Sequence, residues 1–219
     1  MLQACLFDLD GVLVDTARHH FTAWQRLAQE RIGVTFTHHD NEQLKGLSRL
    51  ESLNYILSKT DQSFSDEAMQ EMMQVKNDWY LELVAQLTPE DALPGATDLL
   101  HALKDAGIKT GLGSASKNAP LIIEKLGIAH LLDVVIDGNV VSKSKPDPEV
   151  FLKGADALNV SPANTIVFED ALSGVAAAKS GGFFCVGIGL PEDLLQADFV
   201  VRDLSQIKIE LLNKTFFSH

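Results

Sequence analysis

Residues 4–16 read Ala-Cys-Leu-Phe-Asp-Leu-Asp-Gly-Val-Leu-Val-Asp-Thr, and this stretch decides the fold. Its apolar start is too short for a helix and stops abruptly at acids and a glycine, which is typical of a buried strand in a parallel sheet. Because side chains alternate along a strand, we expect Asp8 and Asp10 to project to the same side, roughly 7 Å apart. Ligands of open α/β sheets bind at the carboxyl ends of strands, and Gly11 suits a tight turn or a close approach to a ligand there.

Three interpretations of Asp8 and Asp10 remain open on this pattern alone. The two residues are acids of an ordinary loop, a site for a cation, or a nucleophile with its acid/base partner. Two carboxylates beside an apolar strand are costly unless a ligand or a reaction uses them. The rest of the chain has to decide between these interpretations.

Composition and charge narrow the classes of protein. The chain has 219 residues, which suits one large domain or a domain with an insert, and a formal net charge of -12. With no basic run, the charge argues against nucleic acid and anionic membranes as partners. No run is long enough to span a bilayer, and the N-terminus lacks the basic start of a signal peptide. Cys5 and Cys185 lie in apolar strand-like runs, which favours buried thiols in a reducing cytoplasm over a disulfide.

The order of predicted elements indicates an α/β fold with a helical insert. Between Thr16 and Pro94 only helical patterns occur, and helices are expected over about 17–29, 49–58 and 66–87. From Pro94 onward strands and helices alternate, which implies right-handed crossovers and a parallel sheet. The expected strands are 108–113, 134–137, 165–168, 184–188 and 199–201, and the expected helices are 96–106, 118–126, 148–158 and 171–180. We therefore predict an α/β core of residues 1–15 and 93–219 and an α-helical cap of residues 16–92.

Polar side chains follow three of the predicted core strands or loops. Ser114 lies at a helix start, where hydroxyl and backbone N–H groups favour anions, although Ser116 or Asn118 also fits simple helix capping. Lys145 precedes a proline and fits either an inward-reaching or a solvent-exposed side chain. Glu169 and Asp170 again place acids where an apolar strand stops, and with Asp8 they form an oxygen cluster suited to Mg²⁺.

Taken together and in order, these motifs resemble the four core motifs of the haloacid dehalogenase superfamily. The matching residues are Asp8, Asp10, Gly11, Ser114, Lys145, Pro146, Glu169 and Asp170. The resemblance implies a Rossmann-like core with an inserted cap, phosphoryl transfer through an aspartyl phosphate, and Mg²⁺ as cofactor. A true dehalogenase uses the aspartate without a metal, so the Glu169-Asp170 pair argues against that activity.

The predicted cap narrows the resemblance to the β-phosphoglucomutase family, which interconverts β-D-glucose 1-phosphate and glucose 6-phosphate through β-glucose 1,6-bisphosphate. The matching residues outside the catalytic motifs are Thr16, His20, Trp24, Leu44, Lys45, Gly46, Leu47, Ser48, Arg49, Ser52, Lys76, Asn77, Ala115, Ser116, Lys117 and Asn118. The departures are Gly113, Asp147 and Ala171, and Ala171 replaces a usual serine after Glu169-Asp170. None of these departures removes a predicted catalytic group.

The resemblance also implies a role for each residue. Asp8 is expected to be the nucleophile and Asp10 the general acid/base, and Ser114 and Lys145 are expected to hold phosphoryl oxygens. The expected Mg²⁺ ligands are the carboxylates of Asp8, Glu169 and Asp170 and the carbonyl of Asp10.

The remaining matched residues are expected to bind the substrate. Arg49 is expected to grip a second phosphate, helped by Ser116, Lys117 and Asn118. His20 is expected to orient Asp10 or a sugar hydroxyl. The residues expected to contact the sugar or line the cap are Thr16, Trp24, Leu44, Lys45, Gly46, Leu47, Ser48, Ser52, Lys76 and Ala115.

Several alternatives stay open alongside a monomeric, cytoplasmic mutase. A sugar-phosphate phosphatase would use the same core without needing Arg49. A mutase acting on another hexose or disaccharide phosphate is a further variant. A non-catalytic phosphosugar-binding protein would be expected to lack the nucleophile or a metal-binding acid.

Overall fold

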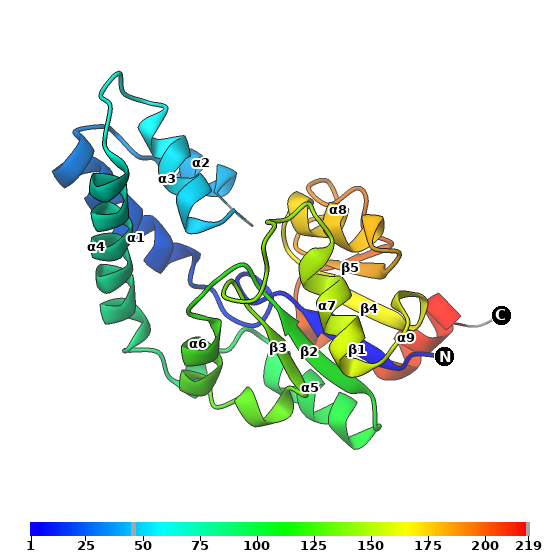
Figure 1. The fold of residues 1–219 in the computed structure, drawn as a ribbon. Helices are drawn as coiled ribbons and strands as arrows, with labels where there is room; N and C mark the ends of the chain where they lie inside the picture. Colours follow the sequence, from blue (N-terminus) through cyan, green and yellow to red (C-terminus); the bar gives the residue numbers. More distant parts are fainter. Residues whose placement is uncertain (45–46, 218–219) are drawn as a thin grey trace. The chain divides into compact units, whose positions relative to one another are not determined.

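The structure, a computed structural model, describes residues 1–44 and 47–217. A six-stranded sheet forms the centre of the fold, in the order β3-β2-β1-β4-β5-β6, and every neighbouring pair is parallel (Figure 1). The strands are β1 (Ala4–Phe7), β2 (Lys109–Gly113), β3 (Val134–Ile136), β4 (Thr165–Glu169), β5 (Phe184–Ile188) and β6 (Phe199–Val201). The predicted parallel-sheet α/β core is confirmed.

Strand β1 lies in the middle of the sheet, and its four residues are fully buried. Its last residue, Phe7, pairs in register with Leu112 of β2 and Phe168 of β4, and the Phe7 and Phe168 rings stack with centroids 4.7 Å apart. The chain places β2 and β3 on one side of β1 and then crosses to β4 on the other side. The switch in strand order therefore lies beside β1, where open α/β sheets bind ligands.

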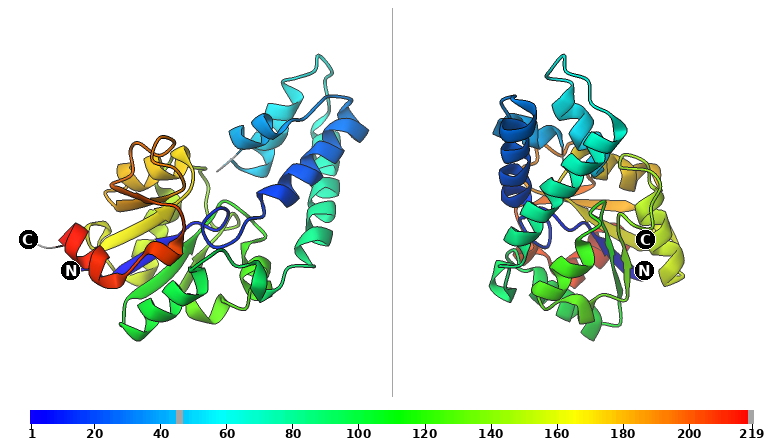
Figure 2. Two further views of the ribbon diagram at one scale, coloured as in Figure 1. Left: turned by 180° about the vertical axis from the view of Figure 1, so that it is seen from behind. Right: turned by 60° about the vertical axis from the view of Figure 1, so that its left-hand side comes forward.

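Helices cover both faces of the sheet. Helices α7 (Glu149–Leu158) and α8 (Leu172–Ser180) pack on one face, where α7 contacts β1 to β3 and α8 contacts β4 and β5. Helices α5 (Ala96–Asp105) and α9 (Ile209–Phe217) lie on the opposite face, in front of the sheet in the left view of Figure 2. Helix α6 (Ala119–Lys125) follows β2. Short 3-10 turns span Pro89–Asp91, Ala129–Leu131, Pro162–Asn164 and Leu204–Gln206.

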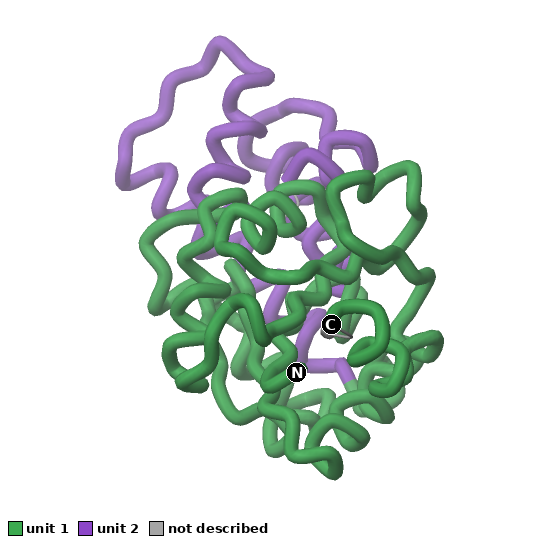
Figure 3. The backbone as a smooth tube through the Cα atoms, turned by 90° about the vertical axis from the view of Figure 1, so that its right-hand side faces the viewer, with its two compact units in different colours: residues 1–15, 88–219 green, residues 16–87 purple. Residues whose placement is uncertain are grey.

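The chain divides into two compact units (Figure 3). One unit contains Met1–Asp15 and Thr88–His219, and the other contains Thr16–Leu87. The segment 88–92, which the sequence pattern includes in the helical block, groups with the sheet. Its end is tied there by a bridge between Ala92 and Val14 and by a 2.9 Å hydrogen bond from Leu93 N to Leu13 O.

The unit Thr16–Leu87 is helical, and we call it the helical unit. It contains α1 (Ala17–Leu27), which continues as a π-helical turn (Ala28–Ile32), and then α2 (His38–Gln43), α3 (Arg49–Leu57) and α4 (Asp66–Val84). Thr37, Ser48 and Ser65 cap α2, α3 and α4 with their side chains, which satisfies backbone N–H groups that a helix start leaves unpaired. Apolar residues from α1, the π-helical turn and α3 form its buried core, including Leu27, Ile32 and Leu53.

Two local features differ from the sequence-based expectations. Strand β1 ends at Phe7, and beyond Asp8 the chain forms a loop closed by hydrogen bonds from Gly11 N to Val14 O and from Leu13 N to Leu9 O. Asp10 therefore lies in that loop and not on the strand, and the expectation that the Asp8 and Asp10 side chains project to the same side stays a prediction. Helix α9 was not predicted, although Ile209, Leu212 and Phe216 have helical spacing. No helix in the described parts of the chain is long and apolar enough to cross a membrane.

Candidate active site

Three carboxylates converge where β1 and β4 end. Asp8 follows the last residue of β1, Glu169 is the last residue of β4, and Asp170 comes next. One oxygen from each of the three lies within 4.8 Å of the others. Because adjacent parallel strands in register end at the same edge, the pairing of Phe7 with Phe168 is what brings these acids together. Asp8 and Glu169 are buried and Asp170 is half-buried.

Lys145 bridges two of these carboxylates. Its Nζ donates to Asp8 Oδ1 at 2.6 Å, to Glu169 Oε1 at 2.5 Å and to the Gly113 carbonyl at 3.2 Å. An ammonium group has three donors, and these three acceptors use all of them. Burial opposes the positive charge, but the Asp8 and Glu169 carboxylates outweigh it and hold the pKa of Lys145 above its ordinary value. Lys145 is 4% exposed, so the inward-reaching alternative is the one observed.

Glu169 is held on both of its oxygens. Oε1 accepts from Lys145, and Oε2 accepts from the backbone N–H of Ala171 at 3.1 Å. Burial raises the pKa of the Glu169 carboxyl, the Lys145 ammonium opposes that rise, and the neighbouring carboxylates of Asp8 and Asp170 add to it. The backbone at position 171 thus supports Glu169 although the chain lacks the usual serine hydroxyl there.

Two glycines leave room for the acids. A Cβ on Gly174, in the first turn of α8, would overlap Glu169 Oε1, and a Cβ on Gly11 would overlap Asp170 Oδ2. Gly11 also has φ +80°, a backbone conformation that side-chain-bearing residues rarely adopt. Both acids therefore lie directly against the backbone, and any larger residue at either glycine would have to displace a carboxylate.

The loop after β2 carries the predicted phosphate-binding hydroxyl. Ser114 is buried, and its Oγ accepts from Ser116 N at 3.1 Å, while Ser116 Oγ accepts from Asn118 N at 3.2 Å. These two turns lead into α6, whose N-cap residue, Asn118, makes no side-chain capping hydrogen bond, so the alternative of helix capping by Ser116 or Asn118 is not observed. Lys117 is exposed, and Ala115 is half-buried with its carbonyl oxygen against Gly138.

The donor set at the strand ends fits Mg²⁺. The three carboxylates and the Lys145 ammonium group together carry a net charge of -2 when all four groups are ionised, and two of the carboxylates are buried. Such a site is unfavourable without a cation. Mg²⁺ prefers oxygen ligands, takes a few carboxylates together with water and phosphate, and carries the two positive charges that balance the cluster.

The helical unit gathers several of its predicted site residues around one lysine. Lys76 on α4 is 2% exposed, and its Nζ lies 2.8 Å from His20 Nδ1 and 4.7 Å from the centre of the Trp24 ring. Arg49, the first residue of α3, is half-buried and donates from Nη2 to Asn77 Oδ1 at 2.7 Å. Burial lowers the pKa of Arg49, but that of an arginine is high enough to keep it charged.

The other predicted residues of this unit have local roles in the structure. Leu44 and Trp24 are buried in its apolar cluster, and Leu47 packs against that cluster. Ser48 caps α3, Ser52 is buried on the same helix, and Thr16 is fully buried before α1. Lys45 and Gly46 lie outside the described residues.

Two residues at these sites were not predicted from the sequence. Gly174 has no side chain that could mark it in the sequence. Its role is visible only in the structure, where an added Cβ would overlap Glu169 Oε1. Tyr80 lies one helical turn after Lys76 and touches three predicted site residues. Its spacing of four residues from Lys76 was a usable signal, because such pairs share one face of a helix.

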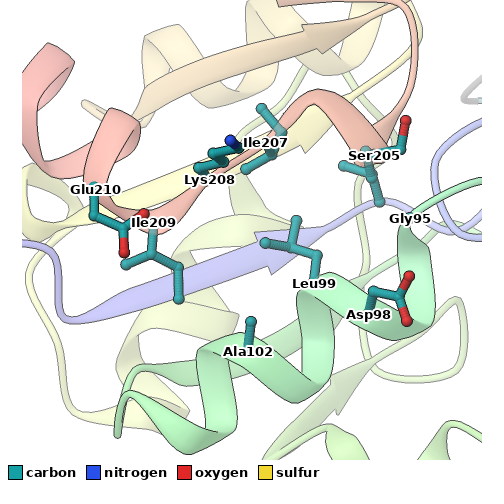
Figure 4. A pocket seen from close by; sticks show the side chains of 10 residues that line it. Gly95, Asp98, Leu99, Ala102, Ser205, Ile207, Lys208, Ile209 and Glu210 are labelled. Atoms are coloured by element: carbon teal, nitrogen blue, oxygen red, sulfur yellow. The ribbon is translucent and has the colours of Figure 1, made fainter.

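A surface pocket of about 330 Å³ lies elsewhere on the sheet unit (Figure 4). It lies between α5, which contributes Leu99 and Ala102, and the segment that leads into α9, which contributes Ile207 and Ile209. None of the ten residues that line it is a predicted site residue. The chemistry therefore has to be sought at the strand ends.

Comparisons with known proteins point to one family. Residues 2–182 match the model of the family described as haloacid dehalogenase-like hydrolase. The chain is 45% identical over 215 residues to a beta-phosphoglucomutase of Bacillus subtilis (strain 168), covering 97% of this chain and 95% of that protein. It matches the crystal structure of a beta-phosphoglucomutase from Clostridium difficile with a TM-score of 0.95 and 42% identity, covering 99% of this chain and 97% of the other. It is also 33% identical over 222 residues to a validoxylamine A 7'-phosphate phosphatase of Streptomyces hygroscopicus subsp. limoneus, covering 95% and 97% of the two chains.

Proposed function

The chain belongs to the haloacid dehalogenase-like hydrolase family, and on that premise we propose that it is a phosphomutase that interconverts β-D-glucose 1-phosphate and glucose 6-phosphate. The observation that carries the proposal is the buried cluster of Asp8, Glu169 and Asp170, bridged by Lys145 at the switch in strand order. The extensive identity to beta-phosphoglucomutases supports the choice of reaction. A monomeric state and a cytoplasmic location are further parts of this proposal.

The reaction begins with Asp8 as the nucleophile. A carboxylate oxygen of Asp8 attacks the phosphorus of a sugar phosphate, the bond from phosphorus to the sugar oxygen breaks, and an aspartyl phosphate forms. Lys145, already hydrogen-bonded to Asp8 Oδ1, stabilises the negative charge of the transferring phosphoryl group through its own positive charge, and the Ser114 hydroxyl holds a phosphoryl oxygen. Phosphoryl transfer depends mainly on such positioning and charge stabilisation.

Asp10 moves the proton that each transfer requires. It donates a proton to the sugar oxygen as that oxygen leaves the phosphorus, and it accepts one from the sugar hydroxyl that attacks the aspartyl phosphate in the second transfer. The half-buried Asp10 lies in the loop closed by Val14, and its backbone bridges that residue. This loop geometry lets Asp10 serve a separate role from Asp8 although only one residue lies between them.

The carboxylates of Asp8, Glu169 and Asp170, with the carbonyl of Asp10, would hold Mg²⁺. Bound there, Mg²⁺ would offset the charge of the acids and of the phosphoryl group. Lys145 and the Ala171 N–H hold Glu169 in place from the side of the protein. Glu169 is therefore positioned by protein groups, the Lys145 ammonium and the Ala171 N–H, that are not themselves proposed metal ligands.

A mutase needs a second anion site, because its bisphosphate intermediate has to bind with either phosphate at Asp8. Arg49 is the residue of the helical unit that suits this role, since a guanidinium group can grip a phosphate with two hydrogen bonds. Its contact with the Asn77 side chain orients the group without neutralising its charge. The helical unit would then act as a cap that excludes water from the aspartyl phosphate.

We expect Arg49→Ala to separate the two activities. Mutase activity should fall by about a hundredfold, because losing the charged hydrogen bonds between a guanidinium group and a phosphate costs roughly 2–3 kcal/mol of binding free energy. Hydrolysis of p-nitrophenyl phosphate, which has no second phosphate, should change less than about threefold. Arg31→Ala, which removes an exposed arginine of the same unit paired with Glu71, is the matched control. Equal loss of both activities in Arg49→Ala would show that Arg49 is structural.

A product assay tests the proposed function directly. The purified protein is mixed with β-D-glucose 1-phosphate, Mg²⁺ and a trace of β-glucose 1,6-bisphosphate, and glucose 6-phosphate and inorganic phosphate are followed in parallel. We expect glucose 6-phosphate to form without matching phosphate release and to depend on the bisphosphate. Phosphate as the main product would overturn the proposal.

A sugar-phosphate phosphatase is the second candidate, and the identity to a validoxylamine A 7'-phosphate phosphatase favours it. A phosphatase would use the same Asp8, Asp10 and acid cluster but would transfer the phosphoryl group to water. The ratio of phosphate to glucose 6-phosphate in the product assay decides between the two activities.

A further inference from the structure

Tyr80 touches three residues of the helical unit that the sequence predicts at the substrate site. It is fully buried on α4, and its hydroxyl donates to Thr16 Oγ1 at 3.1 Å. Its ring centroid lies 4.1 Å from that of His20 and 4.7 Å from Lys76 Nζ. A single side chain therefore contacts the residue at which the helical unit begins, His20 on α1, and Lys76 on its own helix.

The contacts follow from the spacing on two packed helices. Lys76 and Tyr80 lie one turn apart on α4, and Thr16 and His20 lie one turn apart at the start of α1, where His20 N donates to Thr16 O at 2.9 Å. Residues four apart share a face of a helix, and α1 packs against α4. The four side chains therefore form a two-by-two arrangement in which Tyr80 faces both Thr16 and His20.

The surroundings of Lys76 preserve its positive charge. Its ammonium lies over the Tyr80 and Trp24 rings, each 4.7 Å from Nζ. Aromatic faces attract a cation without neutralising it. The Nζ also lies 2.8 Å from His20 Nδ1, and since an ammonium group can only donate, Nδ1 accepts and the ring proton of neutral His20 resides on Nε2.

The charges around His20 agree with this assignment. Burial lowers the pKa of His20 well below its ordinary value, and Lys76 on α4, Arg49 on α3 and His19 on α1 lower it further. His20 is therefore neutral near pH 7 and presents an N–H donor at Nε2. Water beside the His20 imidazole would weaken the effect of burial, and the pKa of His20 would then rise.

We propose that Tyr80 is a positioning residue, whose ring holds the Lys76–His20 pair in place and whose hydroxyl holds Thr16 at the start of the helical unit. The proposal rests on the proposed function, because the expectation that Thr16, His20 and Lys76 bind the substrate or orient Asp10 belongs to that function. Tyr80 acts through these residues and does not itself contact a reacting atom.

The chain supplies a matched control, because it has only two tyrosines. Tyr55 on α3 also uses its hydroxyl, which donates to Asp40 Oδ1 at 3.0 Å, and its ring also faces a lysine, with Lys59 Nζ 5.3 Å from the centroid. Neither partner of Tyr55 is a predicted site residue. The same substitutions therefore remove a hydroxyl hydrogen bond and an aromatic ring beside a lysine at both positions, at the fully buried Tyr80 and at the half-buried Tyr55.

The experiment uses full-length Tyr80→Phe, Tyr80→Leu, Tyr55→Phe and Tyr55→Leu variants. The first readout is the pKa of His20 by NMR of the imidazole in the free protein, with its signal assigned by its loss in His20→Gln. We expect that pKa to rise toward its ordinary value in Tyr80→Leu and to stay unchanged in Tyr80→Phe and both Tyr55 variants. An unchanged pKa in Tyr80→Leu, or an equal rise in Tyr55→Leu, would overturn the proposal.

The second readout is kcat/KM for conversion of β-D-glucose 1-phosphate. We expect a loss of about fivefold in Tyr80→Phe, the factor typical of one hydrogen bond, and of about tenfold or more in Tyr80→Leu, with less than about twofold in the Tyr55 variants. If Tyr80→Leu does not fold, the comparison of the two Phe variants still decides, and equal losses contradict the proposal. If the wild-type protein releases only phosphate, the proposed function fails, while the His20 titration still tests Tyr80.

Discussion

Asp8→Asn is expected to lose essentially all turnover, by at least about 10⁴-fold, because the amide oxygen is a poor nucleophile and no aspartyl phosphate can form. The amide keeps the shape of the carboxylate and can still accept the hydrogen bond that Lys145 donates to Asp8 Oδ1. The fold should therefore persist. Formation of glucose 6-phosphate and of phosphate should both be measured, together with the mass of the protein after brief exposure to a phosphoryl donor.

The matched control for this variant is Asp15→Asn, an exposed aspartate in the same stretch of chain. It removes the same charge and should retain nearly full activity and a phosphorylated protein mass. Wild-type turnover in Asp8→Asn would contradict the assignment of Asp8 as the nucleophile. If the Asp8→Asn variant loses turnover but still becomes phosphorylated, a residue other than Asp8 is the nucleophile.

Gly174→Ala is expected to lower activity by about a hundredfold or more at a given Mg²⁺ concentration, as expected when a group that holds a metal ligand is disturbed. The added Cβ would overlap Glu169 Oε1, so the carboxylate has to leave its position between Lys145 and the Ala171 N–H. Alanine is a better helix former than glycine, so α8 itself should not be weakened. The measurement is activity against Mg²⁺ concentration, with thermal unfolding followed in parallel.

Gly154→Ala on α7 provides the control for Gly174→Ala. A Cβ at Gly154 would lie 3.0 Å from Leu6 Cδ2, an apolar side-chain end that can shift slightly. This variant tests tight packing of a helix on the sheet without touching the acid cluster, so its dependence on Mg²⁺ should match the wild type. Equal activity and Mg²⁺ dependence in the two variants would mean that Glu169 does not need its observed position.

Much of the core could be predicted from the chain because its signals are local. The apolar run before Asp8, the glycines and prolines between elements, and the alternation of helix and strand patterns indicate all six strands within a residue or two. Helix α9 was missed although its apolar spacing is regular. The loop position of Asp10 was missed because the strand alternation was extended through Asp10, whereas strand β1 ends at Phe7.

The sequence by itself determined which chemical groups are available: the carboxylates of Asp8 and Asp10, Lys145 beside a proline, and the acids at 169 and 170. It also determined that Asp8, Glu169 and Asp170 lie at strand ends, because an apolar run that stops at an acid is visible without coordinates. It did not determine whether Lys145 is buried or exposed, since a single lysine beside a proline fits both.

Only the tertiary structure decided which of these groups meet. The order of the strands places β1 beside β4, so residues more than 160 positions apart in the chain share an oxygen cluster. It also decided that Lys145 satisfies all three of its donors, that Gly174 makes room for Glu169, and that Tyr80 faces Thr16 and His20. The physical reason is that contacts between distant segments depend on strand order and helix packing, which no local pattern of residues encodes.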